Sequence, residues 1–381
     1  MTQGLVLDYL QYSPEIGREA ALAARGAIIG RSTLGAHPVL AAYATLRADG
    51  ESIRIGANAW FGEHATVHIA DSIMGAVIGN DVTVGRHGLV HACVLGDGVV
   101  VGESAVVMDG ASVGPNALIA ADSVVPPRKE LPGGFVYAGH PARPVRAIDP
   151  AELAGIARDL RAGVVAPLLA STRLPEWAAV VSHVGDAPGP LRRQDGRSPT
   201  IARAYVAPTA IVAGAVEVAD DSSVFFGCAV SAGDGRIVIG PRSNVQDNSL
   251  LATDRRRGDL VLGAGVTIGH NVEIGSAMIG DDVLIGMGSR LGDEVVVEAG
   301  ACIAAGAWVD PGTVVPAGWI WAGRPARAFR EIKDSERREF ARAGAVYVRY
   351  ASAYRDASSP GSLTAQPRVA VGSEVDGGSR S

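Results

Sequence analysis

Aromatic residues and cysteines are scarce in this sequence of 381 residues. Phe, Trp and Tyr together make up 5%, and the three cysteines, Cys93, Cys228 and Cys302, lie far apart without a CxxC pair. This spacing argues against a disulfide framework and against a cysteine zinc site, and it favours a reducing compartment. A core with few rings must be built from Val, Ile, Ala and Leu, which suits many short, similar strands better than a few large helices.

A basic surplus and long apolar runs are missing as well. The chain has 34 Lys and Arg against 40 Asp and Glu, a formal net charge of −6, so it cannot neutralise a nucleic-acid backbone with a general excess of basic residues. No stretch approaches the roughly 18 apolar residues of a membrane helix, and the N-terminus lacks a basic region followed by an apolar one. We therefore expect a cytoplasmic protein that acts on a small molecule, without nucleic-acid or membrane partners.

Aliphatic residues recur every six positions in both halves of the chain. They stand at Leu95, Val101, Val107, Val113, Ile119 and Val125, and again at Ile279, Ile285, Leu291, Val297, Ile303, Val309 and Val315. A period of six fits neither a helix nor a simple alternating strand, and its strictness disfavours a β-sandwich of short strands. It fits a solenoid whose coils have three flat faces, each made of a short strand and a turn. The pattern therefore predicts a mainly β, hexapeptide-repeat solenoid.

A longer periodicity relates the two halves to each other. A constant offset of 184 pairs Val84-Gly85 with Ile268-Gly269, without gaps. Both halves also share an irregularity, a step of five residues from Val90 to Leu95 and from Ile274 to Ile279. Because a shared defect is harder to acquire twice than shared regularity, we infer a tandem duplication.

Helix signals follow each half. Asp149-Pro150 offers an N-cap and a proline at the first helical position, and Asp334 or Ser335 can cap the apolar stripe that follows. The predicted organisation is a first β-helix at 1–148, a helix and linker at 149–198, a second β-helix at 199–333, a C-terminal helix at 334–357 and a disordered tail at 358–381.

Several segments resemble the γ-class carbonic anhydrases, within the hexapeptide-repeat superfamily that also includes many acyltransferases. They are RAD (47–49), VHI (67–69), LVHACVLGD (89–97) and AGHPARPVRAI (138–148) in the first half, and RSNVQD (242–247), IGH (268–270) and AGRPARAFREI (322–332) in the second. The resemblance covers roughly residues 25–148 and 200–335. It implies two tandem left-handed parallel β-helices, an exception to the usual right-handed crossover rule. It also implies a homotrimer-like packing with an interfacial Zn²⁺ held by three histidines, or with another divalent metal such as iron or cobalt.

Neither half carries the whole histidine pattern of that family. The first half has His68 and His91 at the two outer ligand positions, but Arg86 at the middle one, with His87 beside it. The second half has only the middle ligand, His270. Arg86 cannot bind a metal, since its guanidinium stays protonated, but with its neighbour it could bind a bicarbonate-like anion or another substrate.

The supporting residues are divided between the halves too. The resemblance assigns catalytic or supporting roles to Arg47, Asp49, Tyr137, Asn244 and Gln246, and a substrate-binding role to Asp247. Arg47 and Asp49 match an Arg-x-Asp pair that holds the site geometry. The residue that would orient water or substrate, Gln246, belongs to the second half.

The spacing of the histidines predicts that the first half needs a third metal ligand from another surface. With about 18 residues per coil, Arg86 is expected one coil above His68, and His91 near the opposite edge of the next face. A surface of the first half that faces a surface of the second would complete a site of His68, His91 and His270. Three chains could instead form a ring of first halves beside a ring of second halves, which would leave both sets incomplete.

Several functions stay open at this point. The leading one is attack of zinc-bound hydroxide on CO2 or another small carbonyl compound. The same chemistry would serve an acyl-CoA thioesterase, and a hexapeptide acyltransferase would need a histidine general base, for which His87 or His64 could serve. A two-histidine site, or one relocated to His87 or His64, is a further alternative, as is a degenerate pair that acts as a non-catalytic assembly scaffold.

Overall fold

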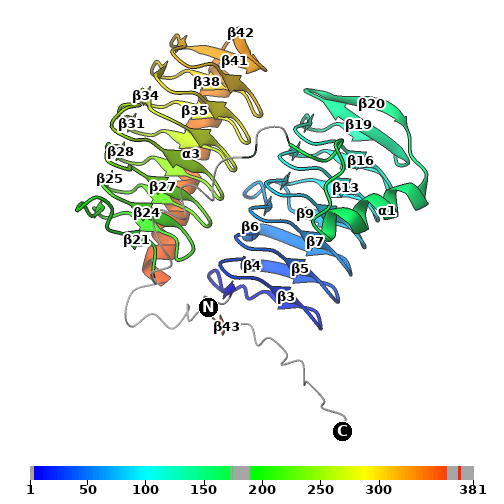
Figure 1. The fold of residues 1–381 in the computed structure, drawn as a ribbon. Helices are drawn as coiled ribbons and strands as arrows, with labels where there is room; N and C mark the ends of the chain where they lie inside the picture. Colours follow the sequence, from blue (N-terminus) through cyan, green and yellow to red (C-terminus); the bar gives the residue numbers. More distant parts are fainter. Residues whose placement is uncertain (1–3, 172–173, 175–188, 358–367, 370–381) are drawn as a thin grey trace.

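Two β-solenoids stand side by side in the computed structural model (Figure 1). The structure describes residues 4–171, 174, 189–357 and 368–369. Most of the expected disordered tail, and residues 172–173 and 175–188 of the expected linker, lie outside these ranges. Parallel pairing joins the strands of successive coils, an antiparallel pair of strands ends each solenoid, and one helix follows it. The fold prediction, two left-handed parallel β-helices each followed by an α-helix, is confirmed.

The first β-helix has three faces. The face that carries the site contains β8 (Thr66–His68), β11 (Leu89–His91), β14 (Val106–Val107) and β17 (Val124–Val125). The second contains β9 (Ala76–Ile78), β12 (Val94–Leu95), β15 (Ser112–Val113) and β18 (Glu130–Leu131). The third contains β3 (Ala21–Leu22), β5 (Val39–Leu40), β7 (Trp60–Phe61), β10 (Thr83–Val84), β13 (Val100–Val101), β16 (Leu118–Ile119), β19 (Phe135–Gly139) and β20 (Ala142–Ala147).

Long strands join the first two of these faces. β4 (Ala27–Leu34) and β6 (Thr45–Ile55) each run along one face and continue into the next, so that their hydrogen-bonded pairing merges both faces into one 13-stranded sheet. The first residues of β6 pair with β8, and its last residues pair with β9. The edge is completed by β1 (Leu5–Leu7), β2 (Glu15–Ile16) and β43 (Arg368–Val369). Arg47 and Asp49 thus lie where a strand turns a corner.

The second β-helix has three separate sheets. The first contains β21 (Leu191–Arg192), β24 (Ile211–Ala213), β27 (Ala229–Ser231), β30 (Leu250–Ala252), β33 (Glu273–Ile274), β36 (Arg290–Leu291) and β39 (Trp308–Val309). The next contains β22 (Thr200–Ile201), β25 (Val216–Val218), β28 (Ile237–Ile239), β31 (Leu260–Leu262), β34 (Ala277–Ile279), β37 (Val295–Val297) and β40 (Val314–Val315). The last contains β23 (Tyr205–Val206), β26 (Ser223–Val224), β29 (Asn244–Val245), β32 (Thr267–Ile268), β35 (Leu284–Ile285), β38 (Cys302–Ile303), β41 (Trp319–Gly323) and β42 (Ala326–Glu331).

The six-residue repeat fills the interior of each prism. Val101 and Val107, two of the repeat positions, are fully buried, and each stacks in register on the equivalent residue of the next coil. The glycine that follows such a position lets the coils approach each other. A Cβ on Gly85 would lie 2.9 Å from the backbone nitrogen of Glu103 in the next coil, closer than side-chain carbons come. The pattern therefore specifies both the core and the tight stacking of the coils.

The two helices lie in different places. α1 (Pro150–Arg161) is capped by the Asp149 carboxylate, which accepts from the backbone N–H groups of Ala151 and Glu152. Its Leu153 and Leu160 pack on the third face of the first β-helix. α3 (Asp334–Ala357) runs along the last sheet of the second β-helix (Figure 1). It also contacts the first β-helix, through Arg349 to Asp71 and Tyr354 to Asp49. Within the described residues, neither helix is long and apolar enough to cross a lipid bilayer.

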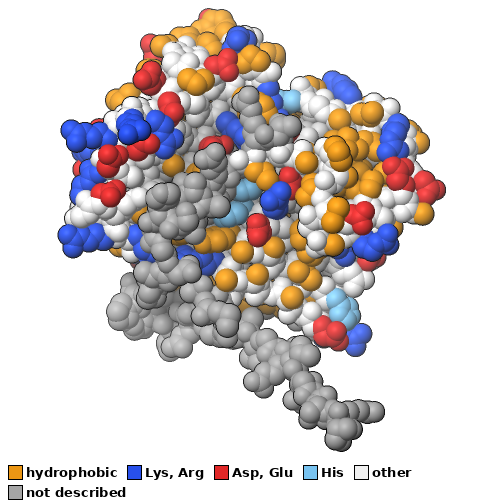
Figure 2. All heavy atoms as spheres, viewed as in Figure 1, with side chains coloured by type: hydrophobic (Ala, Val, Ile, Leu, Met, Phe, Trp, Pro, Cys, Tyr) orange, Lys and Arg blue, Asp and Glu red, His pale blue; other side chains and the backbone are white. Residues whose placement is uncertain are grey.

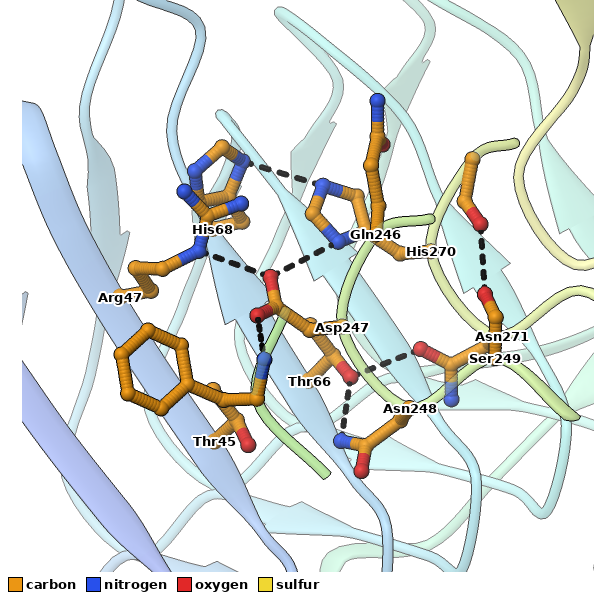
Figure 3. Close-up of polar contacts among 12 residues, drawn as sticks. Thr45, Arg47, Thr66, His68, Gln246, Asp247, Asn248, Ser249, His270 and Asn271 are labelled. Atoms are coloured by element: carbon orange, nitrogen blue, oxygen red, sulfur yellow. Dashed lines mark hydrogen bonds and ion pairs between the residues drawn. The ribbon is translucent and has the colours of Figure 1, made fainter. Parts of the chain in front are cut away.

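The two β-helices meet at corners that correspond in the sequence. His64 Nδ1 lies 3.3 Å from Asn248 Oδ1, and Asn271 donates to the backbone oxygen of His87 at 3.2 Å; each pair is 184 residues apart. Thr66 donates to Asn271 Oδ1 at 2.7 Å and accepts from Asn248 Nδ2 at 2.9 Å (Figure 3). A surface of the first half therefore faces a surface of the second within one chain, without a ring of three.

Candidate metal centre

Three buried histidines converge at this interface. His68 ends β8, His91 ends β11, and His270 follows β32 of the second β-helix. His68 Nδ1 lies 3.1 Å from His91 Nε2 and 3.1 Å from His270 Nε2. All three side chains are buried, and their facing nitrogens lie within 4.8 Å of one another. The structure thus brings together the two outer positions of the first half and the middle position of the second.

The predicted placement of His91 relative to His68 is wrong. The two residues are direct register partners on adjacent coils of the same face, and not at opposite edges of different faces. The reason is that His91 stands 23 positions after His68, because an additional turn closed by the Ala70–Met74 bridge interrupts the regular repeat. The extra residues also move Arg86 off this face: it follows β10, and its Nε binds Glu103 at 2.6 Å.

Each histidine has a carboxylate on its outer nitrogen. His68 Nε2 lies 3.2 Å from Asp49, His91 Nδ1 lies 2.6 Å from Asp109, and His270 Nδ1 lies 3.0 Å from Asp247. Metal-binding histidines commonly have such a partner, which fixes the ring orientation and the tautomer and raises the basicity of the inner nitrogen. The three partners are therefore arranged as the second layer of a metal site would be: Asp49, Asp109 and Asp247.

This arrangement leaves no proton for hydrogen bonds among the three inner nitrogens. When the outer nitrogen of each neutral ring carries the proton toward its carboxylate, the inner nitrogen presents a lone pair. Lone pairs that face one another at such distances, 3.1 Å from His68 to each of the other two and within 4.8 Å overall, repel unless a cation lies between them. Tetrahedral zinc with Zn–N distances of about 2.0–2.1 Å separates its ligand nitrogens by roughly 3.3 Å. The two spacings of 3.1 Å from His68 to His91 and His270 are close to that value, and all three nitrogens lie within 4.8 Å of one another, so a small adjustment of the rings would let them hold such an ion.

A fully buried arginine joins the carboxylates of the two halves. Arg47 Nε donates to Asp247 at 2.8 Å (Figure 3). Its NH1 nitrogen donates to Asp49. The guanidinium also lies 4.5 Å from the ring centre of Phe225. Burial alone would lower the pKa of Arg47, but the two carboxylates raise it well above its ordinary value. Arg47 and Asp49 come from β6, and Asp247 comes from the second half. This buried ion network therefore links the two β-helices.

The same network sets the charge states of the site. Burial, with a smaller effect of Arg47, holds the pKa of His68 well below its ordinary value, and burial lowers the pKa of His270 to about 4. Burial would raise the pKa of Asp247, but Arg47 and His270 bring it down to about 2. At neutral pH, His68 and His270 are therefore neutral and Asp247 is ionised, which are the states that a metal ion requires.

Two tyrosines of α3 complete the inner surface of the site. The Tyr347 hydroxyl lies 3.2 Å from His270 Nε2 and 3.5 Å from an Arg47 nitrogen, and the Tyr354 hydroxyl donates to Asp49 at 3.2 Å. Sequence reasoning identified the apolar stripe of this helix but assigned its tyrosines no role. The signal available was a series of hydroxyl-bearing rings along one stripe, which a purely structural helix does not need.

Asp109 was also missed. It stands 18 residues after His91 on the next coil, one residue beyond the position that the pairing of β11 with β14 stacks on that histidine. A carboxylate one coil from a candidate ligand on the same face is the signal that could have identified it.

Of the other predicted site residues, Gln246 and Asn244 lie near the triad and Tyr137 lies away from it. Gln246 lies beside His270 (Figure 3). It donates to Asn244, which in turn donates to Thr267. The structure does not bring Tyr137 to the histidines: its hydroxyl donates to the Pro132 oxygen at 2.8 Å, because β19 lies three strands beyond β10.

His64 and His87 form a separate stack at the meeting corners. Their rings are parallel, 4.8 Å apart, and Tyr43 stacks on His64 at 4.6 Å. Both histidines are buried, and burial lowers the pKa of each. They therefore belong to the interface between the β-helices. His87 lines a cavity of only about 10 Å³, about the space of one water molecule, so this stack offers little room for the substrate of a general base, and among the described residues only His68, His91 and His270 form a metal-binding group.

A cavity of about 490 Å³ opens beside the triad. His68, His91 and Gln246 form part of its wall, and α3 supplies another part through Phe340 and Tyr347. Figure 2 shows histidine atoms on the molecular surface at the junction of the two β-helices. The triad is thus buried between the solenoids but borders a space that can admit a small molecule.

The fold and this geometry define a left-handed β-helix protein with a histidine triad suited to a divalent metal. The chain is 38% identical over 138 residues to Gamma carbonic anhydrase 1, mitochondrial, of Arabidopsis thaliana, which covers 35% of this chain and 50% of that protein. It is 35% identical over 161 residues to Carbonic anhydrase of Geobacillus kaustophilus (strain HTA426), which covers 42% of this chain and 88% of that protein. The chain thus spans about half the length of the Arabidopsis relative.

The chain belongs to the γ-class carbonic anhydrase-like family, because it covers most of the Geobacillus carbonic anhydrase at this identity. No family model matches the sequence. Among solved structures, a putative acetyltransferase from Desulfovibrio desulfuricans G20 aligns with 94% of this chain and 83% of its own, with a TM-score of 0.51 and 13% identity. That likeness shows the solenoid fold alone.

Proposed function

We propose that the chain is a carbonic-anhydrase-like metalloenzyme that hydrates CO2 or another small carbonyl compound at one site per chain. The observation that carries the proposal is the triad, in which three inner imidazole nitrogens face one another while each outer nitrogen binds a carboxylate. Zn²⁺ is the leading ion for three nitrogen ligands, and iron or cobalt is the alternative. A bound Zn²⁺ lowers the pKa of coordinated water to about 7 and so supplies hydroxide at neutral pH.

The protein's own residues have separable tasks in this proposal. His68, His91 and His270 would hold the ion, and their three carboxylate partners keep the rings oriented. Arg47 fixes two of those carboxylates, so its role is to position the ligands and it does not reach the substrate. Gln246 reaches the cavity and offers an amide that can orient water or substrate. The Tyr347 hydroxyl limits access to the triad from the side of α3.

The geometry of the triad and the kinship with carbonic anhydrases support this function over the non-catalytic alternative. A scaffold has no need for three buried histidines, each with an aspartate on its outer nitrogen. Burying such polar groups costs free energy unless they are hydrogen-bonded or bind a metal. The kinship with carbonic anhydrases gives the same reaction class. The division of the site between the halves, which the sequence left as an open question, is consistent with cooperation because the two sets meet within one chain.

Metal analysis of the purified full-length protein tests the proposal. We expect about one metal ion per chain, loss of that ion in His270→Ala, and loss of CO2 hydration in stopped-flow assays of the same variant. His37→Asn is the matched control, because the His37 side chain is 42% exposed, pairs with Glu19 away from the triad, and stands at a positive φ that asparagine tolerates. Full metal content in His270→Ala would show that the two halves do not share a site.

A further inference from the structure

The cavity beside the triad is far larger than CO2 needs. Its volume is about 490 Å³, whereas a molecule of three atoms occupies roughly 50 Å³, judged from about 30 Å³ for a water molecule in the liquid. Cavities that bind drug-sized ligands measure about 300–1,000 Å³. The space is therefore suited to a substrate with a sizeable group attached to its reacting carbon.

The walls of the cavity indicate what that group is. Three parts of the chain contribute apolar side chains: Met108 of the first β-helix, Leu284 and Met287 of the second, and Phe340 and Val346 of α3. Methionines and leucines at a cavity wall accommodate flexible aliphatic chains, because their side chains adapt in shape and offer no hydrogen-bonding groups. The group that enters this cavity is therefore apolar, and it must be joined to a carbonyl carbon that reaches His68 and His91.

The charged residues around the cavity indicate which leaving group the substrate carries. Its lining includes the carboxylates of Asp71, Asp109 and Glu339, while Arg342 is the one lysine or arginine among its described lining residues. Phosphate groups are bound by clusters of basic side chains or by helix N-termini. This lining favours an uncharged leaving group over a phosphorylated one such as coenzyme A.

We propose that the cavity binds the aliphatic acyl group of a carboxylic ester or thioester with an uncharged leaving group, which the site hydrolyses. This inference rests on the metal-dependent function proposed above. Water adds to the acyl carbonyl carbon, the bond from that carbon to the leaving oxygen or sulfur breaks, and the products are a carboxylic acid and an alcohol or thiol. No oxidant or second cofactor is required.

α3 offers a matched pair of variants for the test. Ala343 is solvent-exposed and lines this cavity, so Ala343→Trp can fill part of it without disturbing the core. Ala341, two residues earlier, lines a second groove of about 650 Å³ on the other flank of α3. Ala341→Trp therefore adds the same bulk to the same helix while leaving the cavity beside the triad open.

The experiment measures kcat/KM of the metal-loaded protein for p-nitrophenyl acetate and p-nitrophenyl hexanoate. We expect a preference of about tenfold or more for the hexanoate, since four additional methylenes are removed from water. Ala343→Trp should reduce that preference at least about fivefold, a partial loss of the same buried area, and Ala341→Trp should leave it unchanged. Equal rates for both esters in the wild type, or equal losses in both variants, would overturn the proposal.

Two further measurements separate this inference from the proposed function. Hexanamide should raise the melting temperature of the wild type and of Ala341→Trp more than acetamide does, with no such difference in Ala343→Trp, and this binding does not depend on metal. If hexanamide fails to bind, the acyl site is wrong even when metal content and CO2 hydration are intact. Hexanoyl-coenzyme A should be hydrolysed more slowly than S-hexanoyl-N-acetylcysteamine, an uncharged thioester of the same thiol type, and a faster rate would overturn the assignment of an uncharged leaving group.

Discussion

His68 Nδ1 lies 3.1 Å from His270 Nε2, although the two residues are 202 positions apart and belong to different β-helices. A metal bound between them would therefore be held by a single folded chain. The expected trimer-like association stays a prediction, but the triad does not depend on it.

Metal content should consequently be independent of protein concentration. Because all three candidate ligands come from one chain, dilution cannot separate them. We expect about one ion per chain in samples that light scattering shows to be fully dissociated and in concentrated samples alike. A metal content that falls as an oligomer dissociates would show that a ligand comes from another chain.

Replacing Asp109 should weaken metal binding without unfolding the protein. The Asp109 carboxylate binds His91 Nδ1 at 2.6 Å but is 45% exposed, so Asp109→Asn leaves no buried charge behind. Removal of such a carboxylate partner typically costs about 10–100-fold in metal affinity. Competition with a chelator at pH 7 measures the change. Asp97→Asn, which alters an exposed turn of the first β-helix, is the control, and equal affinities for both variants would contradict the assigned role.

Arg47→Met should strongly destabilise the fold. It removes the guanidinium that lies between Asp49 and Asp247 and leaves two buried carboxylates without their cation. Breaking a buried ion pair in this way typically costs about 3–5 kcal/mol. Urea denaturation followed by circular dichroism measures the loss. Arg146→Met, which breaks an exposed pair with Glu152, should leave the midpoint unchanged, and a similar shift in both variants would refute the buried network.

The stability of the protein should fall in mild acid because of His64. Burial lowers the pKa of this imidazole to about 3, whereas in the unfolded chain it is about 6.5. Between these values the unfolded chain binds a proton that the folded protein does not, so the free energy of unfolding decreases as the pH falls. The expected slope from this residue is about 1.4 kcal/mol per pH unit below pH 6.5.

His64→Asn provides the test of that slope. Asparagine stands at the corresponding position 248 with the same positive φ, so the backbone accepts it. Urea curves at pH 7, 6 and 5 should show a smaller pH dependence for this variant than for the wild type. His37→Asn, at an exposed position that also has a positive φ, should keep the wild-type slope. Parallel slopes in the wild type and His64→Asn would show that His64 is not the responsible group.

The sequence by itself determined the solenoid and the division of the site. A six-residue repeat such as Val101 to Val107 specifies which side chains enter the prism, since the interior of a coil admits one residue per face. The constant offset between the halves and the complementary losses, His68 and His91 in one and His270 in the other, are properties of the linear chain. Local rules of this kind need no knowledge of distant contacts.

The tertiary structure decided how those parts come together. The extra turn between His68 and His91 placed both on one face, and this could not be derived from an average coil length. The packing of the two solenoids within one chain depends on the summed surface of both, and it put His270 against His68. The return of α3 between the halves brought Tyr347 to the triad. These contacts join residues far apart in sequence, and only the packing of whole elements selects among the possible pairings.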